Sequence, residues 1–174
     1  MAKWFVVVDC QVDFVTGALK NDAAVAALPK IKEAAEKALA DGAKLIFTLD
    51  THYEDYLKTG EGKHLPIEHC IEGTDGWRIV DELQDLANEA IILPKEHFGS
   101  NLWSEYIAEG DEVTMCGFVS SICVCANFSA IKQIEGVEVT VLKDCCADIN
   151  EDMQEAAMKV MAAQQGSIIN FQQH

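Results

Sequence analysis

The chain has 174 residues, of which 49% are apolar and 24% are charged, and its net charge is −16 because 29 acidic residues outnumber 13 basic ones. This length suits one well-cored domain over residues 1–174 and is short for two. The acidic balance, without a basic stripe, makes nucleic acid and anionic membrane surfaces poor partners, and no apolar run has the length of a membrane span.

The seven cysteines are an odd number, and most of them lie in apolar runs. This usage is typical of free thiols in a reducing compartment and not of a disulfide framework. The N-terminus also lacks the pattern of a basic stretch, an apolar stretch and a small-residue cleavage site. We therefore expect a soluble protein of the cytoplasm.

Apolar runs that suit buried strands alternate with runs of helical periodicity. Taken in chain order, strands are predicted over residues 3–9, 44–50, 90–95, 112–117, 137–142 and 167–170. Helices are predicted over residues 29–40, 79–87 and 101–108, from about residue 122, and over 151–165. Pro29 suits the first turn of its helix, and Ser100 suits an N-cap. The alternation predicts a three-layer, Rossmann-like α/β fold with a mainly parallel six-stranded sheet.

The segment between the second strand and the second helix, residues 51–78, has no clear periodicity. It contains three of the five histidines, four glycines and Pro66. An irregular segment of this length inside a compact fold usually has a function or a feature that ties it down.

Four residues of reactive types fall at or just after the carboxyl ends of predicted strands: Asp9, Asp50, Lys95 and Cys123. Binding sites in parallel sheets collect at this edge. Each residue alone could be a solvated strand end, and Cys123 alone could be a small core residue. Together they favour a cysteine-hydrolase site, in which Lys95 stabilises a thiolate at the start of a helix and Asp9 exchanges the proton.

A second set, formed by Asp50, His52 and His69, has the chemistry of a metal site. A carboxylate and an imidazole two residues apart on an extended segment point the same way, and His69 can close the set from further along. Two histidines and one carboxylate leave positions open for water and substrate. The alternative is that these are exposed loop histidines. Glu54 and His64 are further candidates for the same site.

Several common motifs are absent, including G-x-G-x-x-G, the P-loop and G-x-S-x-G. Dinucleotide, nucleoside triphosphate and serine-hydrolase functions are therefore disfavoured. A phosphoacceptor module remains an alternative, because Asp9, Asp50 and Lys95 lie at strand ends. That interpretation needs an acidic pair after the first strand, and it leaves Cys123 unexplained.

Five motifs follow one another over most of the chain: D-C-Q-V-D-F from residue 9, T-L-D-T-H from residue 48, H-C-I-E-G-T-D-G-W from residue 69, P-K-E-H-F-G-S from residue 94 and G-F-V-S-S-I-C-V from residue 117. In this set and order the chain resembles the isochorismatase-like cysteine hydrolases, and within that family it is most similar to the nicotinamidases. The resemblance implies the isochorismatase-like α/β fold.

The resemblance also implies a catalytic triad of Asp9, Lys95 and Cys123 and a reaction through a cysteine thioester. It implies a cis peptide between Phe118 and Val119, so that the backbone amides of Val119 and Cys123 form an oxyanion hole. The implied reaction is metal-assisted hydrolysis of nicotinamide to nicotinate and ammonia, a step of NAD salvage and pyridine nucleotide biosynthesis, by a homo-oligomer.

For the metal site, the resemblance implies that Asp50, His52 and His69 hold one divalent ion. This ion is zinc most often in the family and iron or manganese in other members, and it holds the pyridine nitrogen and ordered waters.

For the substrate pocket, Phe14 matches an aromatic residue that lines the pocket in relatives. Pro66 stands where well-studied nicotinamidases carry an aromatic that sandwiches the ring, so Trp77, Tyr106 or Trp103 would have to replace it. Pro66 favours an alternative in which the substrate is another small amide or carbamoyl compound.

Two further points qualify the resemblance. Ser120 and Ser121 stand where many relatives have a threonine followed by an acid, which changes the polarity of the turn before Cys123. A catalytically silent relative that only binds a ligand is a third alternative, although all three residue types of the triad are retained.

Overall fold

The computed structural model describes residues 1–171 and contains one sheet of six parallel strands. The strands lie in the order β3-β2-β1-β4-β5-β6. Their bounds are β1 (Lys3–Val8), β2 (Lys44–Asp50), β3 (Ile91–Lys95), β4 (Glu112–Phe118), β5 (Glu138–Ala147) and β6 (Ser167–Ile169). The central strands are buried on both faces, as their nearly continuous apolar sequences predict.

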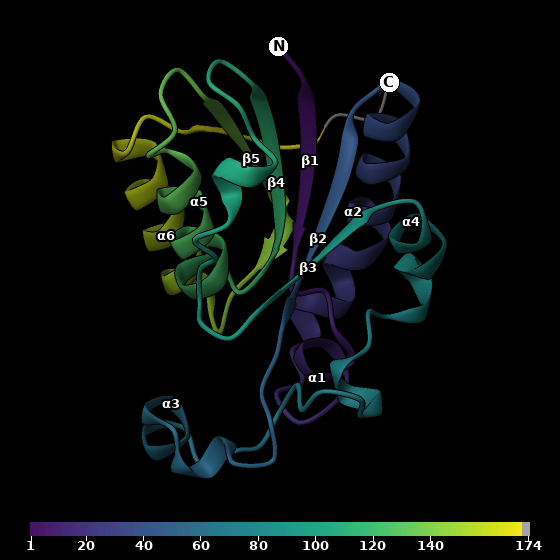
Figure 1. Cartoon of the computed structure of the whole chain (residues 1–174), viewed down its shortest axis with the longest axis vertical. Coiled ribbons are helices and arrows are strands. Elements are labelled where there is room, and N and C mark those ends of the chain that lie inside the picture. The colour runs from purple at the N-terminus through teal and green to yellow at the C-terminus, as the bar shows by residue number, and fades with distance from the viewer. Residues whose placement is uncertain (172–174) are drawn as a thin grey trace.

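Helices cover both faces of the sheet, so the α/β prediction is confirmed. Figure 1 shows α2 (Asp22–Ala40) and α4 (Gln84–Asn88) on one side and α5 (Cys125–Ile131) and α6 (Glu151–Ala163) on the other. Two short helices, α1 (Val12–Val15) and α3 (Gly60–His64), lie beyond the carboxyl ends of the strands. Within residues 1–171, no helix combines the length and apolar character that crossing a bilayer requires.

The first long helix begins earlier than predicted. The chain enters α2 at Asp22, and the side chain of Asn21 caps it by accepting hydrogen bonds from the N–H groups of Ala23 (2.9 Å) and Ala24 (3.2 Å). Pro29 therefore lies inside the helix and not in its first turn. The placement was wrong because an asparagine cap and an alanine-rich first turn outweigh the local cost of one proline.

Two other helix predictions were too long. Residues 79–87 form a 3₁₀ turn, Asp81–Leu83, followed by α4. Residues 101–108 form only the 3₁₀ turn Trp103–Glu105, although Ser100 does accept from the N–H of Leu102. Trp103 is buried and donates its indole N–H to Asn127 on α5 (Cys125–Ile131). Tertiary contacts, and not helix propensity, therefore determine the conformation of this segment.

Strand β5 extends five residues beyond its predicted end, to Ala147. It reaches this length by a register irregularity against β4 between Met115 and Gly117. The extension carries the chain past the end of β4, and the loop that follows lies beside the turn after β4.

The irregular segment 51–78 is tied down at several points. Residue 52 forms a parallel bridge with residue 71, and residue 11 forms an antiparallel bridge with residue 79. Asp13 accepts a hydrogen bond from the N–H of Cys70 at 2.8 Å, and the buried Tyr56 donates its hydroxyl to the carbonyl of Leu65. The segment projects from the sheet in Figure 1 as an arm that contains α3. We refer to residues 51–78 as the arm.

Asp111 fixes the amino end of the sheet and is 4% exposed. Its carboxylate accepts from the N–H groups of Ala2 (2.7 Å) and Ala108 (3.1 Å) and from the indole of Trp4 (2.9 Å). These hydrogen bonds lower the pKa of Asp111 to about 2. Because its folded pKa lies below the usual value of about 4, this carboxylate stabilises the fold above pH 4, and that contribution is lost as the pH falls toward 2.

We expect Asp111→Asn to lower the free energy of unfolding at pH 7 by about 1–3 kcal/mol, since an amide group would turn N–H donors toward other donors. The loss relative to the wild type should shrink between about pH 4 and pH 2. Urea unfolding across this range measures both effects. The exposed Asp81→Asn is the control, and equal losses for the two variants would contradict the role of Asp111.

Candidate functional site

The four reactive residues at strand ends do meet at one edge of the sheet. Asp9 follows β1, Asp50 and Lys95 are the last residues of β2 and β3 and are paired in register, and Cys123 lies in a turn after β4. The parallel order β3-β2-β1-β4 places these ends next to one another.

Asp9 and Lys95 form a buried ion pair. The Nζ atom of Lys95 lies 2.7 Å from Oδ2 of Asp9 and 3.4 Å from Oδ1 of Asp50, and it donates to the carbonyl of His97 at 3.1 Å. The other oxygen of Asp9 accepts from the hydroxyl of Thr48 at 2.6 Å. Asp9 has no exposed surface and Lys95 is 5% exposed, so the pair is shielded from water.

The turn that carries Cys123 departs from β4 under tight local constraints. Gly117 has φ +122°, and a Cβ atom there would lie 2.2 Å from the carbonyl oxygen of Val8. The cis peptide between Phe118 and Val119, which the family resemblance implies, is present. A π-helical turn, Ser120–Val124, then leads into α5, so the sulfur lies near the start of a helix, as predicted.

The protonation states follow from burial and from neighbouring charges. Burial raises the pKa of the Cys123 thiol well above its usual value, and the Asp9 carboxylate raises it further, while Lys95 opposes both effects. Burial is also the main cause that raises the pKa of Asp9. Burial alone would lower the pKa of Lys95, but the carboxylate of Asp9 raises it. Burial and the Asp9 carboxylate therefore favour the thiol form of Cys123, whereas the Lys95 ammonium favours the thiolate that a position near the start of a helix predicts.

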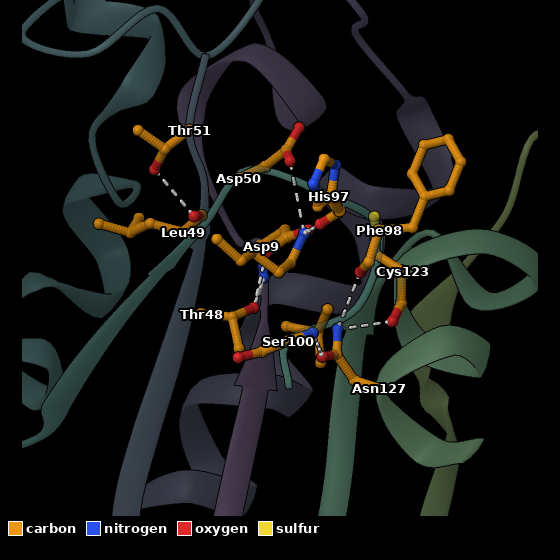
Figure 2. Close-up of polar contacts among 12 residues, drawn as sticks. Asp9, Thr48, Leu49, Asp50, Thr51, His97, Phe98, Ser100, Cys123 and Asn127 are labelled. Carbon is orange, nitrogen blue, oxygen red and sulfur yellow. Dashed lines mark hydrogen bonds and ion pairs between the residues drawn. The ribbon is translucent and has the colours of Figure 1, made fainter. Parts of the chain in front are cut away.

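Asn127, which the sequence analysis did not single out, connects this turn to the loop after β3. Its Nδ2 atom donates to the carbonyls of Cys123 (2.8 Å) and Phe98 (3.1 Å), as Figure 2 shows. Its Oδ1 atom accepts from the N–H of Ser100 and the indole of Trp103. All its hydrogen-bonding groups are used, so this buried amide fixes the backbone beside the thiol.

A second cluster adjoins the first and consists of Asp50, His52, Glu61 and His69, whose ligand atoms all lie within 4.8 Å of one another. Asp50 Oδ2 lies 3.1 Å from Nε2 of His52 and 3.5 Å from Nε2 of His69. Glu61 Oε1 lies 3.7 and 3.6 Å from the same two nitrogens. Two imidazoles and two carboxylates that face a common point fit one divalent cation.

The contacts around this cluster support that assignment. The Nδ1 atom of His69 lies 2.8 Å from the carbonyl of Ile67, which can only accept, so this nitrogen is the donor and Nε2 is left to act as a ligand. Glu61, which was not predicted as a ligand, lies in the first turn of α3, a helix capped by Thr59. Glu54 and His64, which were predicted as further candidates, are exposed, and neither belongs to the cluster.

A cavity of about 820 Å³ connects the two clusters to the surface. Its lining includes Phe14, Val119 and Cys123, together with Asp50 and His69 from the metal cluster. Phe14 thus lies where it was predicted.

Trp77 and Tyr106, which were predicted to line the substrate pocket, are not among the residues that line this cavity. The indole of Trp77 donates to the hydroxyl of Thr51 at 3.0 Å, and Tyr106 packs against the hydrophobic core. Trp103 is buried against Asn127. The aromatic residue that does enter the lining unexpectedly is Phe98, which is half exposed.

The fold and these two clusters define an α/β protein with a buried cysteine, carboxylate and ammonium site beside a candidate metal centre. The Isochorismatase domain model matches residues 3–173 of the chain. The chain therefore belongs to the isochorismatase family, as its motifs indicated.

Several solved structures share the fold. A nicotinamidase/pyrazinamidase from Bacillus subtilis has a TM-score of 0.84 and 20% identity over 98% of this chain and 100% of the other. A pyrazinamidase from Pyrococcus horikoshii, in complex with zinc, has a TM-score of 0.81 and 28% identity with the same coverage. An N-carbamoylsarcosine amidase from Thermoplasma acidophilum has a TM-score of 0.79 and 21% identity over 98% and 96%. No curated protein matches the chain in sequence.

Proposed function

We propose that this protein is a cysteine amidohydrolase that releases ammonia from a small amide, with nicotinamide as the first candidate substrate. The observation that carries the proposal is the buried Asp9–Lys95 ion pair at the same sheet edge as the Cys123 thiol. The structural neighbours support it, because they include a nicotinamidase/pyrazinamidase and an N-carbamoylsarcosine amidase. Nicotinamide hydrolysis would place the protein in NAD salvage, and we propose a cytoplasmic homo-oligomer.

In the first half of the reaction, Asp9 takes the proton of the Cys123 thiol, and the sulfur attacks the amide carbonyl carbon. The C–S bond forms while the π electrons of the carbonyl move onto its oxygen. The backbone N–H groups of Val119 and Cys123 would stabilise this oxyanion. Lys95 stabilises the negative charge on sulfur before the attack, which offsets the burial that otherwise disfavours a thiolate.

In the second half, protonated Asp9 gives its proton to the leaving nitrogen, the C–N bond breaks and ammonia departs. The acyl group remains on Cys123 as a thioester. Asp9 then takes a proton from water, whose oxygen attacks the thioester carbonyl. The C–S bond breaks, Asp9 returns the proton to the sulfur of Cys123, and the carboxylic acid is released. The raised pKa of Asp9 suits these exchanges because it makes the carboxylate a stronger base than a free one.

The cluster of Asp50, His52, Glu61 and His69 would hold one divalent cation, with zinc as the first candidate and iron or manganese as alternatives. When bound, such an ion supplies a Lewis-acidic position for a ring nitrogen or for ordered waters. The side chains of His69 and Asp50 line the same cavity as Cys123, so a ligand held there is oriented toward the thiol.

A second candidate substrate is another small amide or a carbamoyl compound. It is favoured because the cavity has few aromatic side chains that could sandwich a pyridine ring. Among the described residues, the lining includes the phenyl rings of Phe14 and Phe98 and the imidazole of His69, and it lacks both Trp77 and Tyr106. Pro66, where relatives have an aromatic, does not replace them. A panel of nicotinamide, pyrazinamide, aliphatic amides and N-carbamoyl amino acids, assayed by ammonia release, distinguishes the two candidates. Absence of release from every compound would contradict the proposal.

We expect the purified protein to contain about one divalent ion per chain, measured by inductively coupled plasma mass spectrometry. His69→Ala and Glu61→Gln should each lower the affinity for this ion by about tenfold or more, because each removes one of four ligand atoms. A chelator should abolish ammonia release, and the metal should restore it. Glu54→Gln is the matched control, since this exposed carboxylate lies outside the cluster. Equal metal content in all variants would exclude the site.

A further inference from the structure

The turn that carries Cys123 is held at its start by a side chain from a distant part of the sequence. The N-cap position of this turn is Val119, whose side chain cannot accept a hydrogen bond. Its first N–H groups therefore need acceptors from elsewhere. Asp148, directly after β5, provides one: its Oδ2 atom accepts from the N–H of Ser121 at 2.6 Å and its Oδ1 atom from the hydroxyl of Ser121 at 3.0 Å.

Asp148 is itself fixed in place. It is 4% exposed, and its Oδ1 atom also accepts from the N–H of Ile149 at 2.7 Å. Its backbone carbonyl accepts from the side chain of Asn21, the residue that caps α2. A carboxylate with three N–H or O–H donors has little freedom to turn toward a substrate, although Asp148 belongs to the cavity lining.

The segment between the end of β5 and the start of α6 contacts the turn a second time. The hydroxyl of Ser120 lies 3.2 Å from the carbonyl oxygen of Ala147 and also contacts the side-chain oxygen of Gln154 on α6. Two consecutive serines of the turn are thus held by the end of β5 and the start of α6. The unpredicted extension of β5 is what brings Asp148 to this position.

We propose that Asp148 is a positioning residue for the Cys123 nucleophile. By capping the turn through Ser121, it fixes the sulfur and the backbone N–H groups of Val119 and Cys123 relative to the Asp9 carboxylate. The expected effect of Asp148 on kcat rests on the proposed amidohydrolase function. Its expected effect on the exposure of the Cys123 thiol does not.

The test compares Asp148→Asn, Asp148→Ala and Ser121→Ala with Asp144→Asn. Asp144 is a matched control because it lies on β5, the strand that precedes Asp148, and its carboxylate also accepts a backbone N–H, that of Phe171, away from the cavity. Two rates are measured: ammonia release, as kcat and KM, and alkylation of Cys123 by iodoacetamide, followed by mass spectrometry of the peptide that contains it.

Both Asp148 variants should lower kcat by about 10- to 100-fold with a much smaller change in KM, because a small displacement of the reacting groups has a cost of this size. They should also speed alkylation of Cys123 by about threefold or more, since the turn relaxes and the anion at its N-terminus is removed. Ser121→Ala should act in the same direction but less strongly, and the double variant with Asp148→Ala should behave like Asp148→Ala alone. Asp144→Asn should leave both rates unchanged.

A folded Asp148→Asn with kcat and alkylation rate both within twofold of the wild type would overturn the assignment. If Asp148→Ala does not fold, Asp148→Asn and Ser121→Ala decide the question. If the wild type releases ammonia from no amide, the proposed function fails, and the alkylation rates alone then decide whether Asp148 positions the thiol.

Discussion

Cys123→Ala is expected to lower ammonia release from the best amide substrate by about 10⁴-fold or more, because it removes the sulfur on which the proposed covalent intermediate forms. Burial raises the pKa of the Cys123 thiol, so in the proposed mechanism its reactivity depends on proton transfer to Asp9. Mass spectrometry of acid-quenched wild-type enzyme should show a fraction of chains with the acyl group attached. That species should be absent from the variant.

Cys125→Ala is the matched control for this experiment. It removes a thiol two residues away, in the same helical segment, which is half-buried and outside the cavity lining. Its rate should stay within about twofold of the wild type. Equal activity of Cys123→Ala and the wild type would refute the covalent mechanism, whatever the substrate.

Asp9→Asn is expected to lower kcat by about 10² to 10⁴-fold, the usual contribution of a general base. Asparagine has the same shape and can still accept from the hydroxyl of Thr48, but it cannot take the proton of Cys123. The variant also removes a carboxylate that raises the pKa of the Cys123 thiol, which makes the thiolate easier to form. This second effect opposes the loss of the base, and we expect the loss of the base to be the larger of the two.

The control for Asp9 is Thr48→Ser, which retains the hydroxyl that donates to the Asp9 carboxylate and removes only a methyl group. It should reduce kcat by no more than a few-fold. Circular dichroism and thermal unfolding establish that Asp9→Asn is folded. A folded Asp9→Asn that keeps more than about a tenth of the wild-type kcat would show that another group accepts the proton.

The fold could be predicted from the sequence because each of its central strands is an apolar run, and several of these runs end at a polar residue. The runs that end at Asp9, Asp50 and Lys95 needed no long-range information, since parallel strands bring their carboxyl ends to one edge. Helix bounds were less accurate where tertiary contacts replaced periodicity, as at Trp103, or where a cap lay further upstream, as at Asn21.

The parts of the site that sequence reasoning missed lie where the path of the chain depends on tertiary contacts. Glu61 reaches the histidines because the arm folds back after the turn at Tyr56, and no spacing rule connects it to them. Asn127 was not singled out because a polar residue in a predicted helix usually lies on the surface, whereas Asn127 is fully buried. Trp77 was predicted as a replacement for the aromatic residue that is missing at Pro66, but its indole donates to Thr51 and it does not line the cavity.

The arm and the sheet make different contributions to this molecule. Asp9 and Cys123 follow strands of the sheet and Lys95 ends one, whereas three of the four metal-cluster residues belong to the projecting arm. In the proposed function, the groups that break the amide bond and the groups that select the ligand are therefore encoded in separate stretches of sequence. On that proposal, changes within residues 51–78 would alter the ligand preference without altering the residues at the sheet edge, so the reaction type is easier to infer than the substrate.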